Sequence, residues 1–434
     1  MRRDNVLYVT PIMPQRFGNG LAMRAAAVLE ALACRFAVHL FVVPVAGDLS
    51  PPSDFVRSST ARIGGLDLAK NLDPLYALIA RILDPDARER AELAYPKPYL
   101  SRFCTGESAG SLLEWSSKFP VSAVHVMRLY LAPLAHPFLR RPRPERPFCV
   151  LDLDDDEVRT RERLSRLHAD VGDQQAAAVE AAEAKKYRIF ADQFLPAFDR
   201  VIVCSEADAS RLGRQCPGTQ FAVVPNGYGP VDVTIRRRPS NFGPLRLLLV
   251  GNFGYFPNGD AALFLYRQVL SSLRRLTDRE IRIDLAGAGD PPALRGLVRD
   301  LNVRLHGFVE DLAPLYAAAY VAVVPVRAGG GTRIKLLEAF AHRVPVVTTS
   351  LGAEGIDAVD GEQLLVADDA EAFARACLRV KERPELAAEL ADRAAALLDA
   401  RYSPARVDAA IARTYGHPSV CELECACYGN SPFP

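Results

Sequence analysis

The residues best suited to chemistry lie in one short stretch, Arg327 to Phe340, whose sequence is RAGGGTRIKLLEAF. The apolar run Tyr320 to Pro325 before it predicts a buried parallel strand, and the residues after the glycines predict an amphipathic helix. A strand that leads through a glycine-rich turn into a helix exposes unpaired backbone N–H groups at the positive end of the helix dipole, which suits a phosphate. Lys335 and Glu338 are three residues apart, so they share one face of the predicted helix.

A cation beside a carboxylate is what a nucleotide sugar requires, because the cation binds the diphosphate and the carboxylate accepts hydrogen bonds from sugar hydroxyls. We expect the same turn to be lined by Gly330, Gly331, Thr332 and Arg333. A simpler interpretation also fits this stretch, namely a mobile turn followed by a surface helix with one Lys–Glu pair. The rest of the chain favours the ligand site.

An acidic run, LDLDDDE, follows a second predicted strand, Phe148 to Leu153. Alternation along a strand places Asp152 and Asp154 on the same face. Two structural interpretations remain open for these carboxylates. They cap the following helix, where negative charge is favourable, or they form an Asp-x-Asp site that holds a diphosphate through a divalent cation.

Other candidates stand in the first half of the chain. His125 ends a predicted strand, where a histidine is more often packed than catalytic, and Arg24 and Arg128 would face an acceptor or a phosphate. The loop that contains Gly18 and Gly20 would let a ligand approach the backbone closely, although it is also an ordinary turn.

Length and composition bound the class of protein. A chain of 434 residues favours two domains. With 53 basic and 52 acidic side chains the net charge is +1, so no global field recruits nucleic acid or an anionic membrane. Nine scattered cysteines fit free thiols in a reducing compartment, and Cys421, Cys425 and Cys427 lack the fourth ligand of a zinc site. The sequence has no membrane-spanning run and no signal peptide, so we expect a cytoplasmic protein. We also expect it to need no metal or other cofactor.

The order of predicted elements indicates two alternations of strands and helices. The first covers residues 1–230, with an irregular insertion at about 46–118 that contains helical stretches near Leu75 to Leu93. A linker at 231–244 leads to the second, 245–403, and a terminal helix and tail, 404–434, would pack back on the first domain. Strands are predicted at Val6–Thr10, Val38–Val45, Ala123–Met127, Phe148–Leu153, Arg200–Ser205, Phe221–Pro225, Leu245–Val250, Ile281–Ala286, Val303–His306, Val321–Pro325, Pro345–Thr348 and Gln363–Val366. Two such doubly wound parallel sheets bind ligands at the carboxyl ends of their strands.

A series of short motifs stands in order between Leu245 and Val366. They are Val250-Gly251-Asn252 with Pro257-Asn258, Gly287-Ala288-Gly289, His306 to Val309, Leu315 to Ala319, Gly329 to Ala341, and Pro345 to Val347 with Gly355. In this series the C-terminal half resembles the retaining glycosyltransferases of family 4. The N-terminal half resembles them through its glycine loop and the turn Pro225 to Gly227. The resemblance implies the GT-B fold, in which two Rossmann-like α/β domains with doubly wound parallel sheets face one another across a cleft.

The family's activity is transfer of a sugar from a nucleoside diphosphate sugar, such as a UDP-sugar, to an acceptor hydroxyl with retention at the anomeric carbon. By this resemblance Glu338 accepts hydrogen bonds from the ribose, and Lys335 neutralises the departing diphosphate. Gly251 and Asn252 would line the donor site, as would Gly18 and Gly20 from the N-terminal half.

In many relatives a histidine near the reacting sugar carbon stands where Asp154 stands here. Asp154 would then stabilise positive charge at that carbon or assist the acceptor hydroxyl, with Asp152 as the reserve candidate. The sequence also departs from the family pattern, because Gly330 replaces a glutamate eight residues before Glu338. The backbone N–H groups of Gly330 and Gly331 would contact the donor sugar instead. No basic residue follows the first strand of this half, which places more of the diphosphate charge on Lys335.

The leading hypothesis is therefore a metal-independent glycosyltransferase that acts in glycan biosynthesis, with a nucleotide sugar as co-substrate. Two alternatives are a nucleotide-sugar epimerase on the same fold and a non-catalytic sugar-nucleotide-binding subunit. A glycan, a lipid-linked glycan and a small natural product all remain open as acceptor, as does peripheral contact with a membrane.

Overall fold

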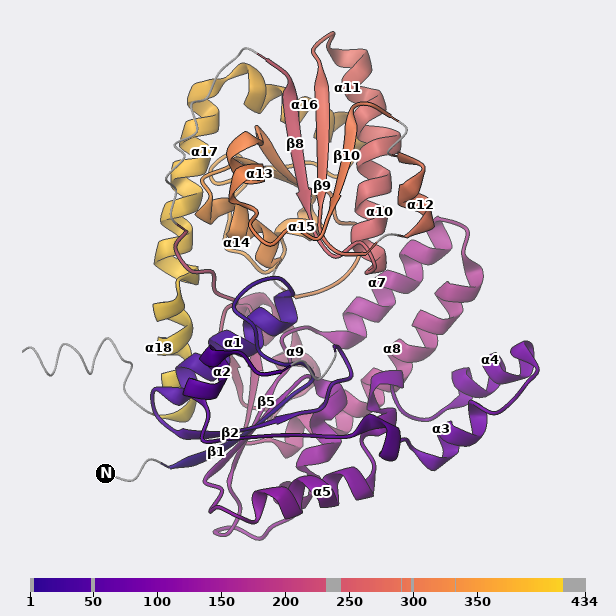
Figure 1. Ribbon diagram of the computed structural model, residues 1–434, viewed down its shortest axis with the longest axis vertical. Helices are drawn as coiled ribbons and strands as arrows, with labels where there is room; N and C mark the ends of the chain where they lie inside the picture. Colours follow the sequence, from indigo (N-terminus) through magenta and orange to yellow (C-terminus); the bar gives the residue numbers. More distant parts are fainter. Residues whose placement is uncertain are drawn as a thin grey trace, which may run out of the picture. The chain divides into compact units, whose positions relative to one another are not determined.

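The computed structural model describes residues 4–47, 51–231, 243–289, 291–297, 300–331 and 333–416. The chain divides into two compact units. One comprises Met1–Pro225 together with Val407–Pro434, and the other comprises Asn226–Arg406. We call them the N-terminal and the C-terminal domain. Each contains one parallel sheet with helices on both faces (Figure 1), which confirms the prediction of two α/β domains.

The N-terminal sheet has the strand order β3-β2-β1-β4-β5-β6-β7, and each neighbouring pair is parallel. Its strands are β1 Asn5–Thr10, β2 Ala37–Val42, β3 Arg62–Gly65, β4 Ala123–Met127, β5 Phe148–Asp152, β6 Arg200–Val203 and β7 Phe221–Val223. Most are continuous apolar runs because both faces of the sheet are covered. The order reverses between β1 and β4, so the carboxyl ends of these two strands form the switch point of the sheet.

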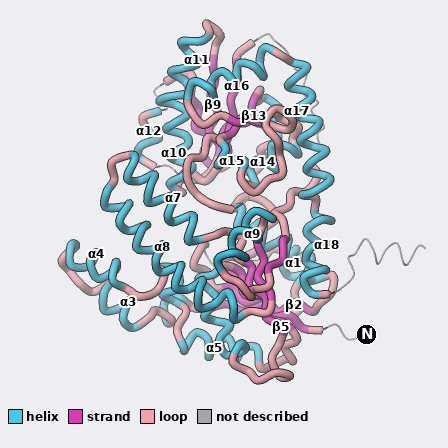
Figure 2. Tube along the Cα trace, turned by 180° about the vertical axis from the view of Figure 1, so that it is seen from behind, coloured by secondary structure: helices cyan, strands magenta, loops and turns pink. Residues whose placement is uncertain are grey.

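Helices from distant parts of the chain cover the two faces of this sheet. One face packs against α1 Gly20–Ala33, α2 Asp54–Ser59 and the part of α18 (Pro404–Tyr415) from Val407 onward. The other packs against α5 Gly106–Ser116, η3 Leu129–Ala135, α8 Gln174–Phe194 and α9 Glu206–Gln215. Helix α7, Glu157–Asp170, lies beside α8 in both Figure 1 and Figure 2.

The region predicted to be an irregular insertion is more regular than expected. Its helices α3 Pro74–Ile79 and α4 Pro85–Ala94 confirm the helical stretches predicted near Leu75 to Leu93. Besides these and α2, β3 and α5 it contains η1 Leu68–Lys70 and η2 Tyr99–Phe103, which were not predicted. The sequence of β3, RIGG, gives no strand pattern, and the strand forms because it pairs with β2 at the edge of the sheet. Helix α7 is the helix that the capping interpretation of the acidic run implies. Its bounds were not predicted, since its sequence EVRTRERLSRLHAD is mostly charged and only a few of its residues are buried. Short helices α6 His136–Leu139 and η4 Leu195–Ala197 complete this domain.

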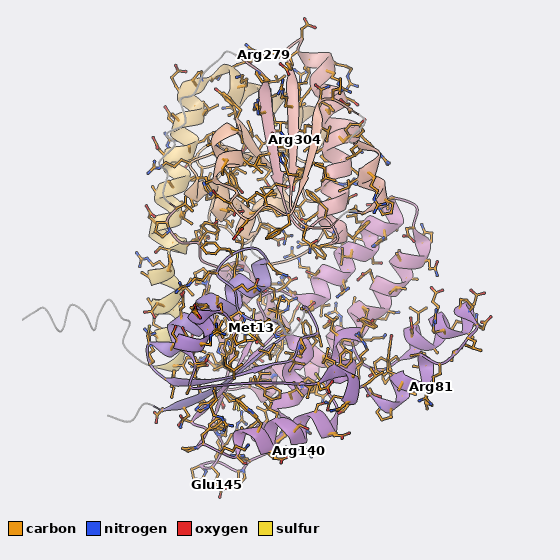
Figure 3. The ribbon with its side chains drawn as sticks, in the orientation of Figure 1. Met13, Arg81, Arg140, Glu145, Arg279 and Arg304 are labelled. Atoms are coloured by element: carbon orange, nitrogen blue, oxygen red, sulfur yellow. The ribbon has the colours of Figure 1, made fainter. Side chains whose placement is uncertain are left out.

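The C-terminal sheet has the order β10-β9-β8-β11-β12-β13, again with parallel neighbours. Its strands are β8 Leu245–Val250, β9 Ile281–Ala286, β10 Val303–Gly307, β11 Val321–Val324, β12 Val346–Thr348 and β13 Leu365–Val366. Arg304, labelled in Figure 3, lies on β10. The switch point of this sheet lies between β8 and β11.

One face of the C-terminal sheet packs against α10 Phe256–Phe264, η5 Leu265–Val269, α11 Leu270–Leu276, α12 Pro292–Arg295 and α16 Ala370–Glu382. The other packs against α13 Ala313–Ala318, α14 Ile334–Ala341 and η7 Leu398–Tyr402, while α17 Pro384–Leu397 contributes to both cores. The short helix α15 spans Ser350–Ala353. The predicted linker falls mainly on residues 232–242 and the cysteine-containing tail on 417–434, which lie outside the described residues.

Candidate functional site

Glycines fix the loop that follows β8 at the C-terminal switch point. Gly287, with φ 146°, lies so close to this loop that a Cβ atom would stand 1.9 Å from the oxygen of Gly251. At Gly289, with φ 87°, a Cβ atom would stand 2.2 Å from the nitrogen of Gly254. The backbone N–H of Phe253 donates to the oxygen of Ala288 at 2.7 Å. No larger residue fits at either glycine without moving backbone, so these contacts set the position of the β8 loop.

The amine of Lys335 reaches the same loop from the first turn of α14. Its Nζ donates to Oδ1 of Asn258 at 2.6 Å, and a Cβ atom built on Gly251 would lie 3.2 Å from this nitrogen. Asn258 in turn donates from Nδ2 to the backbone oxygen of Asn252 at 2.8 Å. Three residues predicted to line one site, Gly251, Asn252 and Lys335, therefore meet through Asn258.

The charge of Lys335 is not paired with a counter-ion among the described residues. Lys335 makes no ion pair with any carboxylate in the described ranges. Part of the residue is exposed, but the atoms packed around its amine withdraw it from water. This desolvation, with the nearby Arg333, lowers the pKa of Lys335 to about 7, although Glu338 acts in the opposite direction. A bound anion would supply the missing negative charge.

Arg333 precedes α14 and folds back over the glycine turn. Its Nη1 donates to the backbone oxygens of Gly330 and Gly331, while Nε and Nη2 are buried and find no partner among the residues that the structure describes. Buried donors without an acceptor are unfavourable, so this guanidinium also favours an anion at the turn. Thr332, predicted to line the same turn, lies outside the described residues.

Two tyrosines bind the carboxylate of Glu338. Tyr228 donates its hydroxyl to Oε1 at 3.0 Å, and Tyr316 donates to Oε2 at 3.1 Å. Burial raises the pKa of Glu338, and the two tyrosine hydrogen bonds and Lys335 oppose that effect. Burial and the neighbouring carboxylate also raise the pKa of both tyrosines well above the ordinary value, so both hydroxyls keep the protons that they donate. A carboxylate has about four acceptor positions, so Glu338 retains the capacity to bind further hydroxyls.

The switch point of the N-terminal domain holds buried ion pairs. Arg24 donates from Nη2 to Oδ1 of Asp152 at 2.8 Å, and both side chains are almost fully buried. Burial alone would raise the pKa of Asp152, but the Arg24 guanidinium and His125 outweigh it and lower this pKa to about 2. His125 is buried as well, and its Nδ1 lies 2.8 Å from the hydroxyl of Tyr415. These three sequence candidates, Arg24, His125 and Asp152, form part of the packed core.

Asp154 lies at the edge of this network and retains some exposure. Its Oδ2 accepts a hydrogen bond from Nη1 of Arg128 at 3.0 Å, and Arg24 Nε lies 3.6 Å from Oδ1. Asp154 and Arg128 both have left-handed backbone conformations, with φ of 56° and 75°, which non-glycine residues rarely adopt outside constrained sites. Arg128 also donates to Glu157 at 2.5 Å.

Helix capping is carried out by a different carboxylate of the acidic run. The side chain of Asp156 accepts a hydrogen bond from the backbone N–H of Arg159 at the start of α7, so the capping interpretation applies to Asp156 and not to Asp154. Within the described ranges, no group of three or more His, Cys, Asp or Glu side chains is arranged to hold a metal ion.

The candidate residues thus form two clusters, one in each domain. The C-terminal cluster contains Gly251, Asn252, Gly330, Gly331, Arg333, Lys335 and Glu338. The N-terminal cluster contains Arg24, His125, Arg128, Asp152 and Asp154. Gly18, with φ 94°, lies in the same loop of the N-terminal domain as Met13, which Figure 3 labels. Gly20 follows this loop as the first residue of α1. Sequence reasoning gave no role to Asn258, Tyr228 or Tyr316, because partners 77, 110 and 22 residues away have no local signal.

The fold and the C-terminal cluster define a Rossmann-like domain with a glycine turn and two nearby cations, Arg333 and Lys335, at its switch point. Residues 244–383 match the family model of "Glycosyl transferases group 1". The segment contains the glycine turn, Lys335 and Glu338.

Solved structures share the fold along nearly the whole chain. Sucrose-phosphate synthase from Thermosynechococcus elongatus superposes with a TM-score of 0.66 and 17% identity, covering 98% of this chain and 100% of that one. HepE from Anabaena, in complex with UDP and glucose, has a TM-score of 0.60 and 13% identity, covering 95% of this chain and 99% of HepE. A glycosyltransferase from Rickettsia africae has a TM-score of 0.58 and 12% identity, covering 99% of this chain and 100% of that one. At these identities the similarity establishes the fold, which is GT-B. That the two domains face one another across a cleft stays a prediction.

Among curated proteins, one described as an uncharacterized 44.6 kDa protein in the cps region of Klebsiella pneumoniae is 24% identical over 224 residues. The alignment covers 49% of this chain and about half, 55%, of that protein's length. None of the described helices is both long enough and apolar enough to cross a membrane.

Proposed function

We propose that this chain is a glycosyltransferase that moves a sugar from a nucleoside diphosphate sugar to an acceptor hydroxyl. The observation that carries the proposal is the arrangement at the start of α14. There Lys335 and Arg333 have no carboxylate partner among the described residues, and Glu338 is held as an acceptor three residues after Lys335. The family match to residues 244–383 covers the same elements.

Each group of the donor has a matching group in this arrangement. The diphosphate would lie at the amino end of α14, where backbone N–H groups, Lys335 and Arg333 offset its charge. The ribose hydroxyls would donate to Glu338. Cleavage of the bond to the sugar builds negative charge on the departing diphosphate, and donors already in place stabilise that charge in the transition state. Because HepE was crystallised with UDP and glucose, we propose a UDP-sugar as the first donor class to test.

In the N-terminal domain Asp154 is the proposed carboxylate of the reaction. It is ionically paired with Arg128 yet retains exposure, whereas Asp152 is buried against Arg24 and serves to position the network. We infer retention at the anomeric carbon and independence from metals from the resemblance to family 4. The acceptor would bind in the N-terminal domain, and a glycan, a lipid-linked glycan and a small natural product are the classes to screen.

The test is donor turnover by wild type and by Lys335→Ala and Glu338→Ala, followed as release of free nucleotide from a panel of nucleoside diphosphate sugars with and without acceptors. We expect each variant to lose at least tenfold in kcat/KM, because one charge-assisted contact contributes roughly 1.5–3 kcal/mol. Glu389→Ala and Arg393→Ala remove an exposed ion pair of the same domain and serve as matched controls.

Turnover by the two site variants equal to that of the controls would refute the site. A product that is an isomerised nucleotide sugar, formed without acceptor, would identify an epimerase. Saturable donor binding without nucleotide release under any condition would identify a non-catalytic binding subunit.

A further inference from the structure

The chain enters and leaves the C-terminal domain through two segments that are bonded to each other. The domain begins at Asn226 and ends at Arg406. Two residues after its start, the backbone N–H of Tyr228 donates to the oxygen of Tyr402 at 2.9 Å. The hydroxyl of Tyr402 accepts a hydrogen bond from the backbone N–H of Asp357 at 2.7 Å. We call residues 226–231 and 402–406 the crossing segments.

Tyr228 belongs to one crossing segment and also contacts the donor-site carboxylate. Its ring packs against the apolar core that contains Leu336 and Phe340 of α14, and its hydroxyl donates to Oε1 of Glu338 at 3.0 Å. A single residue therefore bonds the second crossing segment through its backbone and Glu338 through its side chain.

We propose that Tyr228 couples nucleotide binding at Glu338 to the order of the two crossing segments, so that the polypeptide links to the N-terminal domain respond when the donor site is filled. The inference rests on the proposed function, in which Glu338 accepts the ribose hydroxyls. The carboxylate can accept hydrogen bonds from a ribose and from both tyrosines at once, so ligand and tyrosine do not compete.

The coupling has a simple thermodynamic basis. A ribose bound to Glu338 restricts the carboxylate to the orientation in which it accepts from Tyr228, and this favours the bonded arrangement of the crossing segments. This coupling is reciprocal. If nucleotide binding multiplies the equilibrium constant for ordering the crossing segments by some factor, ordering them multiplies the affinity for nucleotide by the same factor. Loss of the Tyr228 hydroxyl must therefore weaken both.

Tyr316 provides a matched control within the same site. It donates to the other oxygen of Glu338 at 3.1 Å, and it lies on α13, in the middle of the domain sequence. Tyr228→Phe and Tyr316→Phe each remove one hydroxyl that binds the same carboxylate and keep the ring. Both tyrosines hold the carboxylate of Glu338. Of the two, it is Tyr228 that belongs to a crossing segment.

The experiment is amide hydrogen exchange of the full chain with and without UDP, at UDP concentrations that saturate each variant. In wild type we expect UDP to slow exchange at least threefold both in residues 333–340 and in the crossing segments. In Tyr316→Phe both protections persist once UDP is saturating. In Tyr228→Phe the protection of 333–340 persists and that of the crossing segments is lost. Each substitution is also expected to weaken UDP binding about tenfold, measured by calorimetry.

The possible failures separate the coupling from the proposed function. Crossing segments that stay protected in Tyr228→Phe, or that lose protection equally in Tyr316→Phe, would overturn the coupling. The coupling would also be wrong if UDP protects 333–340 of wild type and leaves the crossing segments unchanged. Absence of protection anywhere in wild type, with UDP and with every other nucleoside diphosphate, would overturn the proposed function itself. Exchange in β8, a central strand of the C-terminal sheet, is measured in every sample and reports whether the domain that carries the substitutions is folded.

Discussion

The switch points of the two sheets occupy equivalent places in similar domains, and they differ in how their charges are compensated. In the N-terminal domain Arg24 pairs with Asp152, and Arg128 pairs with Asp154 and Glu157. In the C-terminal domain, across the described residues, neither Arg333 nor Lys335 pairs with a carboxylate.

This contrast separates cations that are part of the fold from the cations that we propose to bind a ligand. A buried cation with a bonded carboxylate is part of the fold, because removing either partner leaves an uncompensated charge. A partly buried cation without a carboxylate is unfavourable in the empty protein, and an anion that binds there offsets this cost and stabilises the folded state. Substitutions at the two kinds of cation should therefore have opposite effects on stability.

The largest expected effect is on the N-terminal pair. Arg24→Met leaves Asp152 buried without its cation, so we expect the free energy of unfolding of this domain to fall by about 3–5 kcal/mol. Urea denaturation measures the loss. Arg16→Met is the matched control, since Arg16 pairs with Glu30 at an exposed site, and its expected effect is about 1 kcal/mol or less. Equal effects of the two substitutions would contradict a structural role for Arg24.

The second effect concerns the glycines that hold the β8 loop. Gly287→Ala would place a Cβ atom against the backbone of Gly251, so we expect a loss of about 1–3 kcal/mol in stability of the C-terminal domain and weaker UDP binding. Gly296→Ala, in the same domain, meets no atom within 4 Å and should leave both properties unchanged. Thermal unfolding with and without UDP measures both. Full UDP affinity in Gly287→Ala would show that the loop contact is dispensable.

Lys335 should behave in the opposite way to Arg24. Replacement by Met removes a desolvated charge, so we expect the free energy of unfolding at pH 7 to stay the same or rise by roughly 1–2 kcal/mol, while UDP binding weakens at least tenfold. The pKa of Lys335 in the folded protein, about 7, lies below its ordinary 10.5, so the unfolded chain binds more protons between these values. The penalty of this amine is therefore fully present below about pH 7 and vanishes as the pH rises to about 10.5. A fall in stability as large as that of Arg24→Met would contradict the distinction between the two cations.

The same pKa gives a smaller and more specific prediction for binding. A diphosphate requires the charged amine, so UDP affinity should decrease above about pH 7, by at most about tenfold per pH unit, as binding takes up a proton. Calorimetry in buffers of different ionisation enthalpy measures that proton. Lys335→Arg, which stays charged, should bind UDP without this pH dependence. Identical pH profiles of wild type and Lys335→Arg would show that Lys335 does not face the diphosphate.

The sequence predicted both sheets because continuous apolar runs are a strong local signal. β8 and β9 have the predicted bounds, Leu245–Val250 and Ile281–Ala286. The edge strand β3 was missed because its glycines carry no such pattern, and it depends on pairing with β2. A local sequence pattern does not predict a strand that forms only because it pairs with a neighbouring strand.

The candidate site shows the same division. Lys335 and Glu338 could be named because a glycine turn before a helix is visible in the chain itself, and Gly251 because of the family resemblance. Their partners Asn258 and Tyr228 could not, because only the folded domain brings them within hydrogen-bond distance. The burial of Arg24 and Asp152 was equally hidden, since a charged residue gives no sequence signal of a buried ion pair. The assignment of Asp152 to catalysis and of Arg24 to the acceptor side stays a prediction, and the buried ion pair favours a positioning role for both.

The most direct test is a crystal structure of the chain grown with UDP. We expect a diphosphate at the amino end of α14, within hydrogen-bond distance of Lys335 Nζ, and ribose hydroxyls on Glu338 between Tyr228 and Tyr316. UDP bound at another place, with Lys335 still on Asn258 and no ligand atom near Glu338, would contradict the proposed donor site.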